Sequence, residues 1–169
     1  MTRVFEYADN LTAIRDLLVE HNTSTASPDL SQDLDVRIND KDVMIGDPLI
    51  THIRGDRYPF IFMRLSNSQE EFQSLGTTGA RGCKKMKTVS VDIFGFYKRD
   101  GASAPYGGLL QGMHTLARNI EGVIQANATL GGTAMWANPR TTTFANLPMD
   151  GGTWVKAVLV EVEARYLFQ

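Results

Sequence analysis

The stretch KTVSVDIFGFYKRDGA, residues 87–102, decides how this chain folds. Its first half alternates apolar and polar residues, which predicts a half-buried strand over 87–98. Three bulky residues then crowd around Gly95: Phe94, Phe96 and Tyr97. Bulky side chains on both faces of a strand need a cover on each face, so we expect a core on one side of the sheet and a second contact on the other.

Length and composition fit a single globular domain spanning 1–169. The chain has 169 residues, of which 43% are hydrophobic and 21% charged, and its formal net charge is -2. This balance is no signature of nucleic-acid or membrane binding, so an electrostatic partner would need a local patch. Cys83 is the only cysteine, which excludes an internal disulfide. With no apolar run of ~20 residues and no secretory signal at the N-terminus, we expect assembly in a reducing cytoplasm.

Periodicity places the remaining elements. Apolar residues at three- and four-residue spacing predict helices over 3–21 and 106–126. Alternation predicts strands over 57–67, 133–146 and 153–169, with the even positions from Val158 to Phe168 facing the core. The stretch 34–57 is ambiguous and suggests a short strand at Leu34–Ile38 and a further hairpin around Gly46.

The polar segment 66–86 has three glycines and no period. It predicts a long loop, and such loops in compact domains are usually functional or ordered on binding. The order of elements indicates an α+β fold, with a mixed, mostly antiparallel sheet of about four strands, two helices packed on one face and an extra hairpin within 34–57.

The sequence matches none of the common catalytic or metal-binding motifs. The histidines His21, His52 and His114 lie far apart, with no carboxylate or cysteine at ligand spacing. The glycine-rich GTTGARGCKK matches no phosphate-binding loop and precedes a strand rather than a helix. Cys83 has basic neighbours but no histidine partner for nucleophilic chemistry. We therefore expect no enzyme activity, no cofactor and no metal.

Two groups of charged residues remain as candidates. Glu161 and Glu163 project from one face of the last strand, roughly 7 Å apart. That spacing would suit acid–base chemistry, but a solvated or subunit-facing surface is the simpler interpretation. The basic cluster consists of Arg81, Lys84, Lys85 and Lys87. It is either a solvated loop or a contact for an acidic partner or for nucleic-acid phosphate.

The chain resembles the tail terminator (tail-completion, minor tail) proteins of long-tailed bacteriophages. The resemblance is carried by YPFIFMRL, a glycine-bearing polar loop, KTVSVDIFGFYKRD, the helix GGLLQGMHTLARNIEGVIQAN and the closing TWVKAVLVEVEARYLFQ. It covers the chain in element order and is specific from about residue 58 onward. The stretch 28–57 departs from the pattern and is interpreted as a hairpin insertion.

The resemblance implies a non-enzymatic virion subunit, located at the head-proximal end of the tail. Such a subunit forms a ring, expected to be hexameric, that caps the tail tube, ends its polymerisation and offers a surface to the head–neck connector. Double-stranded DNA would pass through the hole without sequence-specific binding. The implied subunit interface includes Phe94, Phe96, Tyr97, Glu161, Glu163 and Arg165, and the basic cluster would face the tube or the DNA.

Three alternatives stay open. The chain could be another neck component, such as a stopper or adaptor. It could be a small α+β ligand-binding or enzymatic domain, which would require a pocket with convergent polar groups. A nucleic-acid-binding module would show strongly salt-dependent binding through the basic cluster, although the negative net charge argues against it.

Overall fold

A single five-stranded sheet organises the chain, with strand order β1-β2-β3-β5-β4. The computed structural model describes residues 7–47, 58–72, 85–98, 106–148 and 154–168. The elements are α1 (Tyr7–Glu20), the 3₁₀ turn η1 (Asp40–Asp42), β1 (Val43–Ile45), β2 (Phe60–Phe72), β3 (Lys85–Tyr97), α3 (Tyr106–Ala126), the 3₁₀ turn η2 (Leu130–Gly132), β4 (Trp136–Pro148) and β5 (Trp154–Phe168). The sheet is mixed, because β1 pairs parallel with β2 while the other pairs are antiparallel.

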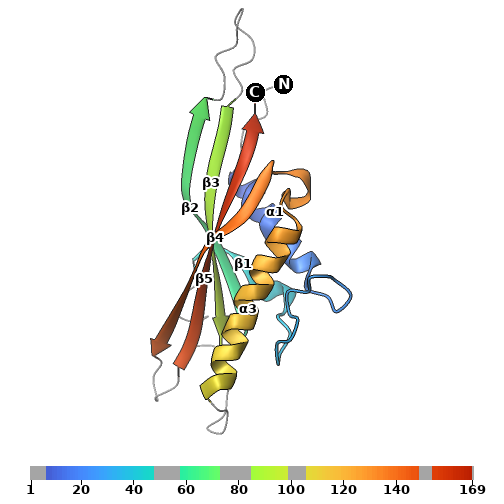
Figure 1. The fold of residues 1–169 in the computed structure, drawn as a ribbon, viewed down its shortest axis with the longest axis vertical. Helices are drawn as coiled ribbons and strands as arrows, with labels where there is room; N and C mark the ends of the chain where they lie inside the picture. Colours follow the sequence, from blue (N-terminus) through green and yellow to red (C-terminus); the bar gives the residue numbers. More distant parts are fainter. Residues whose placement is uncertain (1–6, 48–57, 73–84, 99–105, 149–153, 169) are drawn as a thin grey trace, which may run out of the picture.

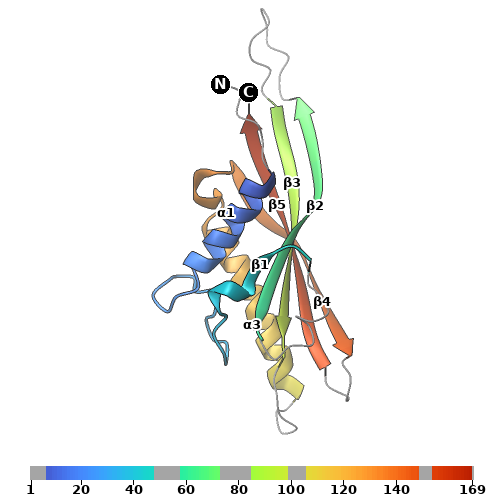
Figure 2. The same ribbon diagram turned by 180° about the vertical axis from the view of Figure 1, so that it is seen from behind.

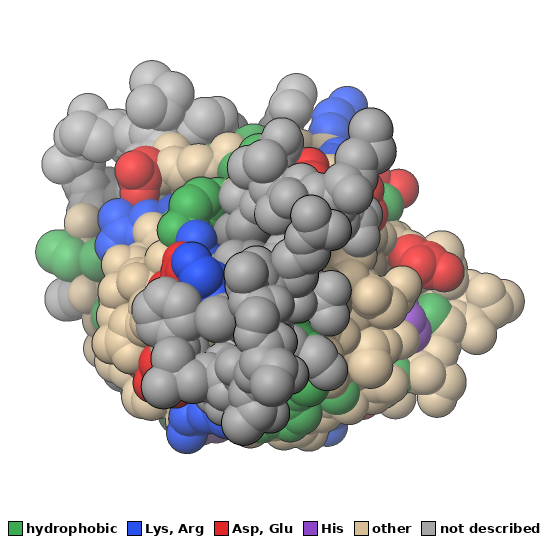
Figure 3. Space-filling model, turned by 90° about the horizontal axis from the view of Figure 1, so that it is seen from above, with side chains coloured by type: hydrophobic (Ala, Val, Ile, Leu, Met, Phe, Trp, Pro, Cys, Tyr) green, Lys and Arg blue, Asp and Glu red, His purple; other side chains and the backbone are tan. Residues whose placement is uncertain are grey.

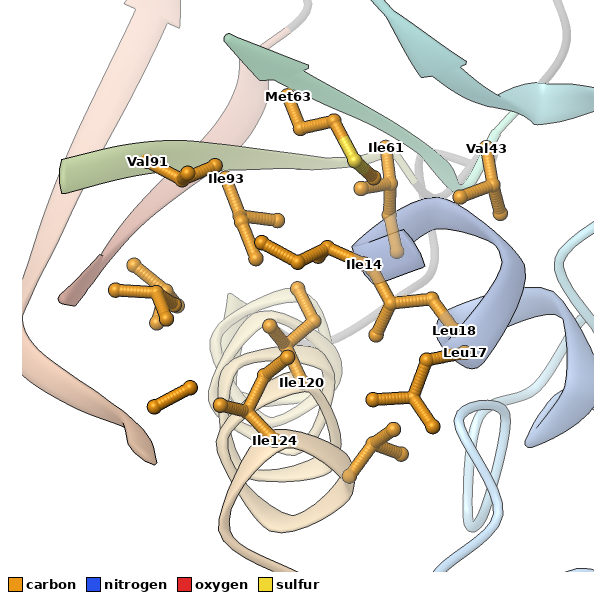
Figure 4. Packing of buried hydrophobic residues seen from close by; sticks show 14 of the residues in the cluster. Ile14, Leu17, Leu18, Val43, Ile61, Met63, Val91, Ile93, Ile120 and Ile124 are labelled. Atoms are coloured by element: carbon orange, nitrogen blue, oxygen red, sulfur yellow. The ribbon is translucent and has the colours of Figure 1, made fainter. Parts of the chain in front are cut away.

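Both helices cover the same face of the sheet, as Figures 1 and 2 show from opposite sides. Side chains from the two helices and from the inward positions of the strands form the main core. Ile14 of α1, Ile120 of α3 and Ile93 of β3 are fully buried and meet in its centre (Figure 4). Burying side chains of this size stabilises the fold by about 1.5–3 kcal/mol each, so the helices are held mainly by these contacts.

The last strand confirms the predicted alternation. Val158, Val160, Val162, Ala164 and Tyr166 are buried on the helix side. The expected α+β architecture is likewise confirmed, with five strands in place of about four. The additional strand, β1, has only three residues and pairs parallel with β2. It lies where the first strand of the hairpin around Gly46 was expected, although its parallel pairing was not.

Two sequence-based predictions need correction. Leu34–Ile38 forms no strand, because its backbone is fixed by the buried side chain of Asn22, which donates to the Ile38 carbonyl at 2.7 Å. The first strand expected for the hairpin around Gly46 is present as β1, and its second half, within residues 48–57, lies outside the described residues. The loop predicted over 66–86 is also too long, since β2 continues to Phe72 and β3 begins at Lys85.

The face opposite the helices carries a second, smaller cluster. Phe60, Phe62, Phe96, Val155 and Ala157 are buried there. The rings of Phe60 and Phe96 stack with centroids 4.7 Å apart, and Phe60 meets Phe62 edge to face at 5.5 Å. Adjacent aromatic side chains on neighbouring strands thus shield one another, and this cluster is the cover that the sequence required for the far face.

The helix side of the same strand is closed by a tight contact at Gly112 of α3. A Cβ atom at this position would lie 2.4 Å from two ring atoms of Tyr97. Only glycine therefore lets the helix approach the ring, which is 3% exposed, and the Tyr97 hydroxyl donates to Asp35 at 3.3 Å. The bulky end of β3 is thus accommodated on both faces within one chain.

Candidate interaction surface

The sheet face opposite the helices is the main candidate for an interaction surface. No described helix or strand covers it. We call it the helix-free face. Its outward positions, by the strand registers, include Phe60, Phe62, Arg64, Gln69, Asp92, Phe94, Phe96, Trp136, Thr141, Thr143, Ala145, Ala157, Leu159, Glu161, Glu163 and Arg165. One end of the face is aromatic and apolar, and the middle is charged.

Glu163 is the centre of a charged network on this face. Arg140 donates to one carboxylate oxygen through Nε at 3.0 Å and Nη2 at 2.6 Å, and Arg165 donates to the other through Nε at 3.0 Å. The Arg165 guanidinium also lies 5.3 Å from the Trp136 ring centroid. With both oxygens engaged by arginines, Glu163 serves as an acceptor and orients the two cations, a role distinct from proton transfer.

Asp92 and Glu161 form an unusual pair beside this network. They are direct partners in the β3–β5 register and so project side by side from the same face. Asp92 is nearly buried and accepts from Arg64 Nε at 3.4 Å, while Glu161 is exposed. Like charges directly opposite one another are destabilising, and Arg64 offsets the repulsion only at Asp92. Arg64 reaches further, to Asp47 at 2.9 Å and to the Phe94 ring at 5.2 Å.

The residues predicted for a subunit interface are thus spread over three environments. Phe96 and Tyr97 are buried on opposite faces, whereas Phe94 is half-buried on the helix-free face. Glu161, Glu163 and Arg165 lie on that same face. The interface assignment stays a prediction, and Glu161 is its one fully exposed member.

The basic cluster is only partly described, because Arg81 and Lys84 lie outside the described residues. Lys85 and Lys87 project toward the helix side at the end of the sheet formed by β2 and β3. Lys85 binds Glu70 at 2.7 Å and lowers the pKa of that carboxyl, and the Lys87 ammonium lies 4.3 Å from the Tyr7 ring. Seen from this end in Figure 3, acidic and basic side chains are interspersed among the described residues.

A buried polar network in the segment after α1 was not foreseen from the sequence. Asn22 is its hub, since its amide donates to the Ile38 carbonyl and to Asp40, and its oxygen accepts from Ser31. Burial alone would raise the pKa of Asp29, but hydrogen bonds from Arg37 and the Ser31 amide lower it below its ordinary value. The network fixes 21–40 against α3 without a regular element.

Among the described residues, no three histidine, cysteine or acidic side chains gather as metal ligands. His21 contacts the Pro28 carbonyl and Asn127, while His114 stacks on Phe144. Two surface hollows of about 360 and 420 Å³ are lined by residues around Tyr58 and around His114, respectively.

Among the described helices, none combines the length and the apolar character needed to cross a membrane. Comparison with known proteins gives no further guide. No protein-family model matches the chain, and no curated protein matches it.

Proposed function

We propose that this chain is a non-enzymatic virion subunit of the tail-terminator kind, which closes into a ring on the head-proximal end of a phage tail tube. The observation that carries the proposal is the helix-free face, a broad sheet surface with a charged middle and an aromatic end. An antiparallel sheet can leave one face to solvent, and a ring subunit can place such a face against a neighbour, a tube or the lumen.

The character of this face fits assembly better than catalysis. Glu163 and Asp92 are engaged by arginines, and Glu161 is exposed. Glu161 is exposed beside the nearly buried Asp92, so a cation from a partner would relieve the repulsion between the two carboxylates. Complementary charge at an interface fixes register and partner choice, which an ordered ring requires.

The partners follow from the same proposal. A tail-tube protein would meet one rim of the ring and a head–neck connector the other, while double-stranded DNA would pass through the lumen without base-specific contacts. Charges of both signs are interspersed on the helix-free face, which suits a lumen that must let DNA slide. Assembly would take place in the host cytoplasm.

A tube-capping assay tests the proposal. Tubes polymerised from the tube protein of the same phage would be mixed with the purified chain, and their length distribution would be followed by electron microscopy. We expect elongation to stop, with density capping one end of each tube. Binding to a portal–adaptor complex without any effect on tubes would instead identify a stopper or adaptor, and binding to neither would refute the assignment to the neck and tail.

A further inference from the structure

The two edges of the sheet differ in a way that points to how copies join. On one edge, β4 has no described partner strand beyond β5. A bulge between Pro139 and Thr141 marks one end of its free length and Pro148 the other. The seven residues Thr141–Leu147 between them carry no charge, no proline and no glycine. Exposed edges are normally blunted by such residues, so this one is open to a further strand.

The opposite edge is only partly closed. β1 covers β2 at Ile61–Met63, and no described strand covers Asn67–Phe72. This free length follows a bulge between Leu65 and Asn67 and carries Glu70 and Glu71. Two such edges would repel one another, because each would bring its glutamates against the other's. The uncharged edge of β4 brings no such repulsion against the acidic edge of β2.

Strand direction makes the two edges compatible. From the antiparallel pairs β2–β3, β3–β5 and β5–β4, strands β2 and β4 run in opposite directions. A second copy whose strands keep the directions of the first chain presents its β2 antiparallel to β4 of that chain. Gln69 is level with Trp136 across one sheet, so a contact with the middle of β4 staggers the copies along the strands, and the strands of a closed ring are then inclined to its axis. Antiparallel pairing is the slightly more stable ladder. It would also continue the sheet with every helix on the same side.

We propose that β4 of one chain pairs with the free part of β2, Asn67–Phe72, of a second copy. The contact is heterologous, so it repeats from copy to copy and gives a ring when the rotation closes. This inference rests on the proposed function and names the surfaces that build the ring. Inward and outward side chains must match, which pairs Gln69 with an outward residue of β4. Pairing with Thr143 sets Glu71 opposite Thr141, next to Arg140, whose side chain is half-exposed.

Cysteine cross-linking tests the proposal on the full chain with Cys83→Ser as background. Gln69→Cys would be combined in turn with Thr141→Cys, Thr143→Cys and Ala145→Cys, three of the outward positions of the free edge. After oxidation, alone and on tail tubes, we expect a ladder of covalent multimers for the Thr143 pair. Gln69→Cys with Thr142→Cys is the matched control, because Thr142 projects to the helix side, where its hydroxyl donates to Glu121, and it should stay monomeric on denaturing gels.

A second arm uses charge on the edge itself. Thr143→Lys places a lysine on the edge, the natural device against strand addition, and should shift the assembled protein to monomers. Thr12→Lys adds the same charge on an exposed position of α1 and should leave assembly unchanged.

The outcomes separate this proposal from the proposed function. Rings or capped tubes without cross-links at any of the three positions would overturn the edge pairing and leave the capping role standing. Cross-links that stop at dimers would overturn head-to-tail pairing in favour of a twofold contact. A ladder formed by a protein that ignores tubes would support the edge pairing and refute capping.

Discussion

Replacing Gly112 by alanine tests how α3 is seated on the sheet. Alanine normally stabilises a helix interior by about 1 kcal/mol relative to glycine. Here the new Cβ would lie 2.4 Å from the Tyr97 ring, about 1 Å inside ordinary contact at 3.4 Å. The ring is buried between helix and strand and has no room to withdraw, so an overpacking cost of about 3 kcal/mol is expected. The net loss in the free energy of unfolding is then about 2 kcal/mol.

Gly122 provides the matched control on the same helix. A Cβ there would meet Pro28 at 3.7 Å, an ordinary van der Waals distance, so Gly122→Ala should stabilise by about 1 kcal/mol. Urea denaturation at one protein concentration measures both variants, and with an m-value of about 2 kcal/mol/M the Gly112 variant loses about 1 M in midpoint.

A double-mutant cycle identifies the clash as the cause. Tyr97→Leu removes the ring, so it should recover part of the loss caused by Gly112→Ala, with a coupling of about 1–2 kcal/mol. If Gly112→Ala stabilises the protein as much as Gly122→Ala does, Gly112 does not lie against the Tyr97 ring and the reasoning is refuted.

Three further changes probe the polar interior. Asn22→Ala should lower the free energy of unfolding, measured by thermal or urea denaturation, by about 2–3 kcal/mol, because its buried partners lose their hydrogen bonds. Thr23→Ala, at an exposed neighbouring position, should change it by less than about 0.5 kcal/mol. Arg37 lowers the folded-state pKa of Asp29, so the ionised carboxylate contributes to the free energy of unfolding above pH ~4, and this contribution is lost as the pH falls. Asp29→Asn should therefore make stability depend less on pH in acid. An unchanged acid dependence would contradict the ion pair. Burial raises the pKa of Tyr166 to about 12, so the folded state holds the phenolic proton and stability falls as pH rises from ~10 toward 12; Tyr166→Phe should remove that alkaline loss, and a loss of equal size in the variant would refute it.

The sequence predicts best those elements whose residues contact the core in a regular period. The helix over 106–126 was predicted with the bounds that α3 has, because its apolar stripe is continuous from Leu109 to Ile124. The even positions of β5 were equally clear. The extension of β2 to Phe72 was missed because residues 66–71 are polar on both faces, and an exposed strand without alternation is indistinguishable from a loop.

The candidate surface was harder to predict, because it depends on contacts between residues far apart in the chain. Glu163 could be placed on an outward face, beside Arg165, from β5 alone. Its other partner, Arg140, lies 23 residues away and is brought in only by the pairing of β4 with β5. The close contact between α3 and the Tyr97 ring requires glycine at position 112, and a single glycine in a helical sequence does not predict such a contact. Likewise, the open edge at Thr141–Leu147 becomes visible only once β4 is known to be the last strand of the sheet.

The proposed ring is tested most directly by the mass of the purified protein in solution, measured by light scattering after size exclusion, with and without tail tubes. We expect about six times the subunit mass of 18.7 kDa, either for the free protein or for the species released from tubes. A monomer at all concentrations that neither binds nor caps tubes would contradict the ring and the function proposed for it.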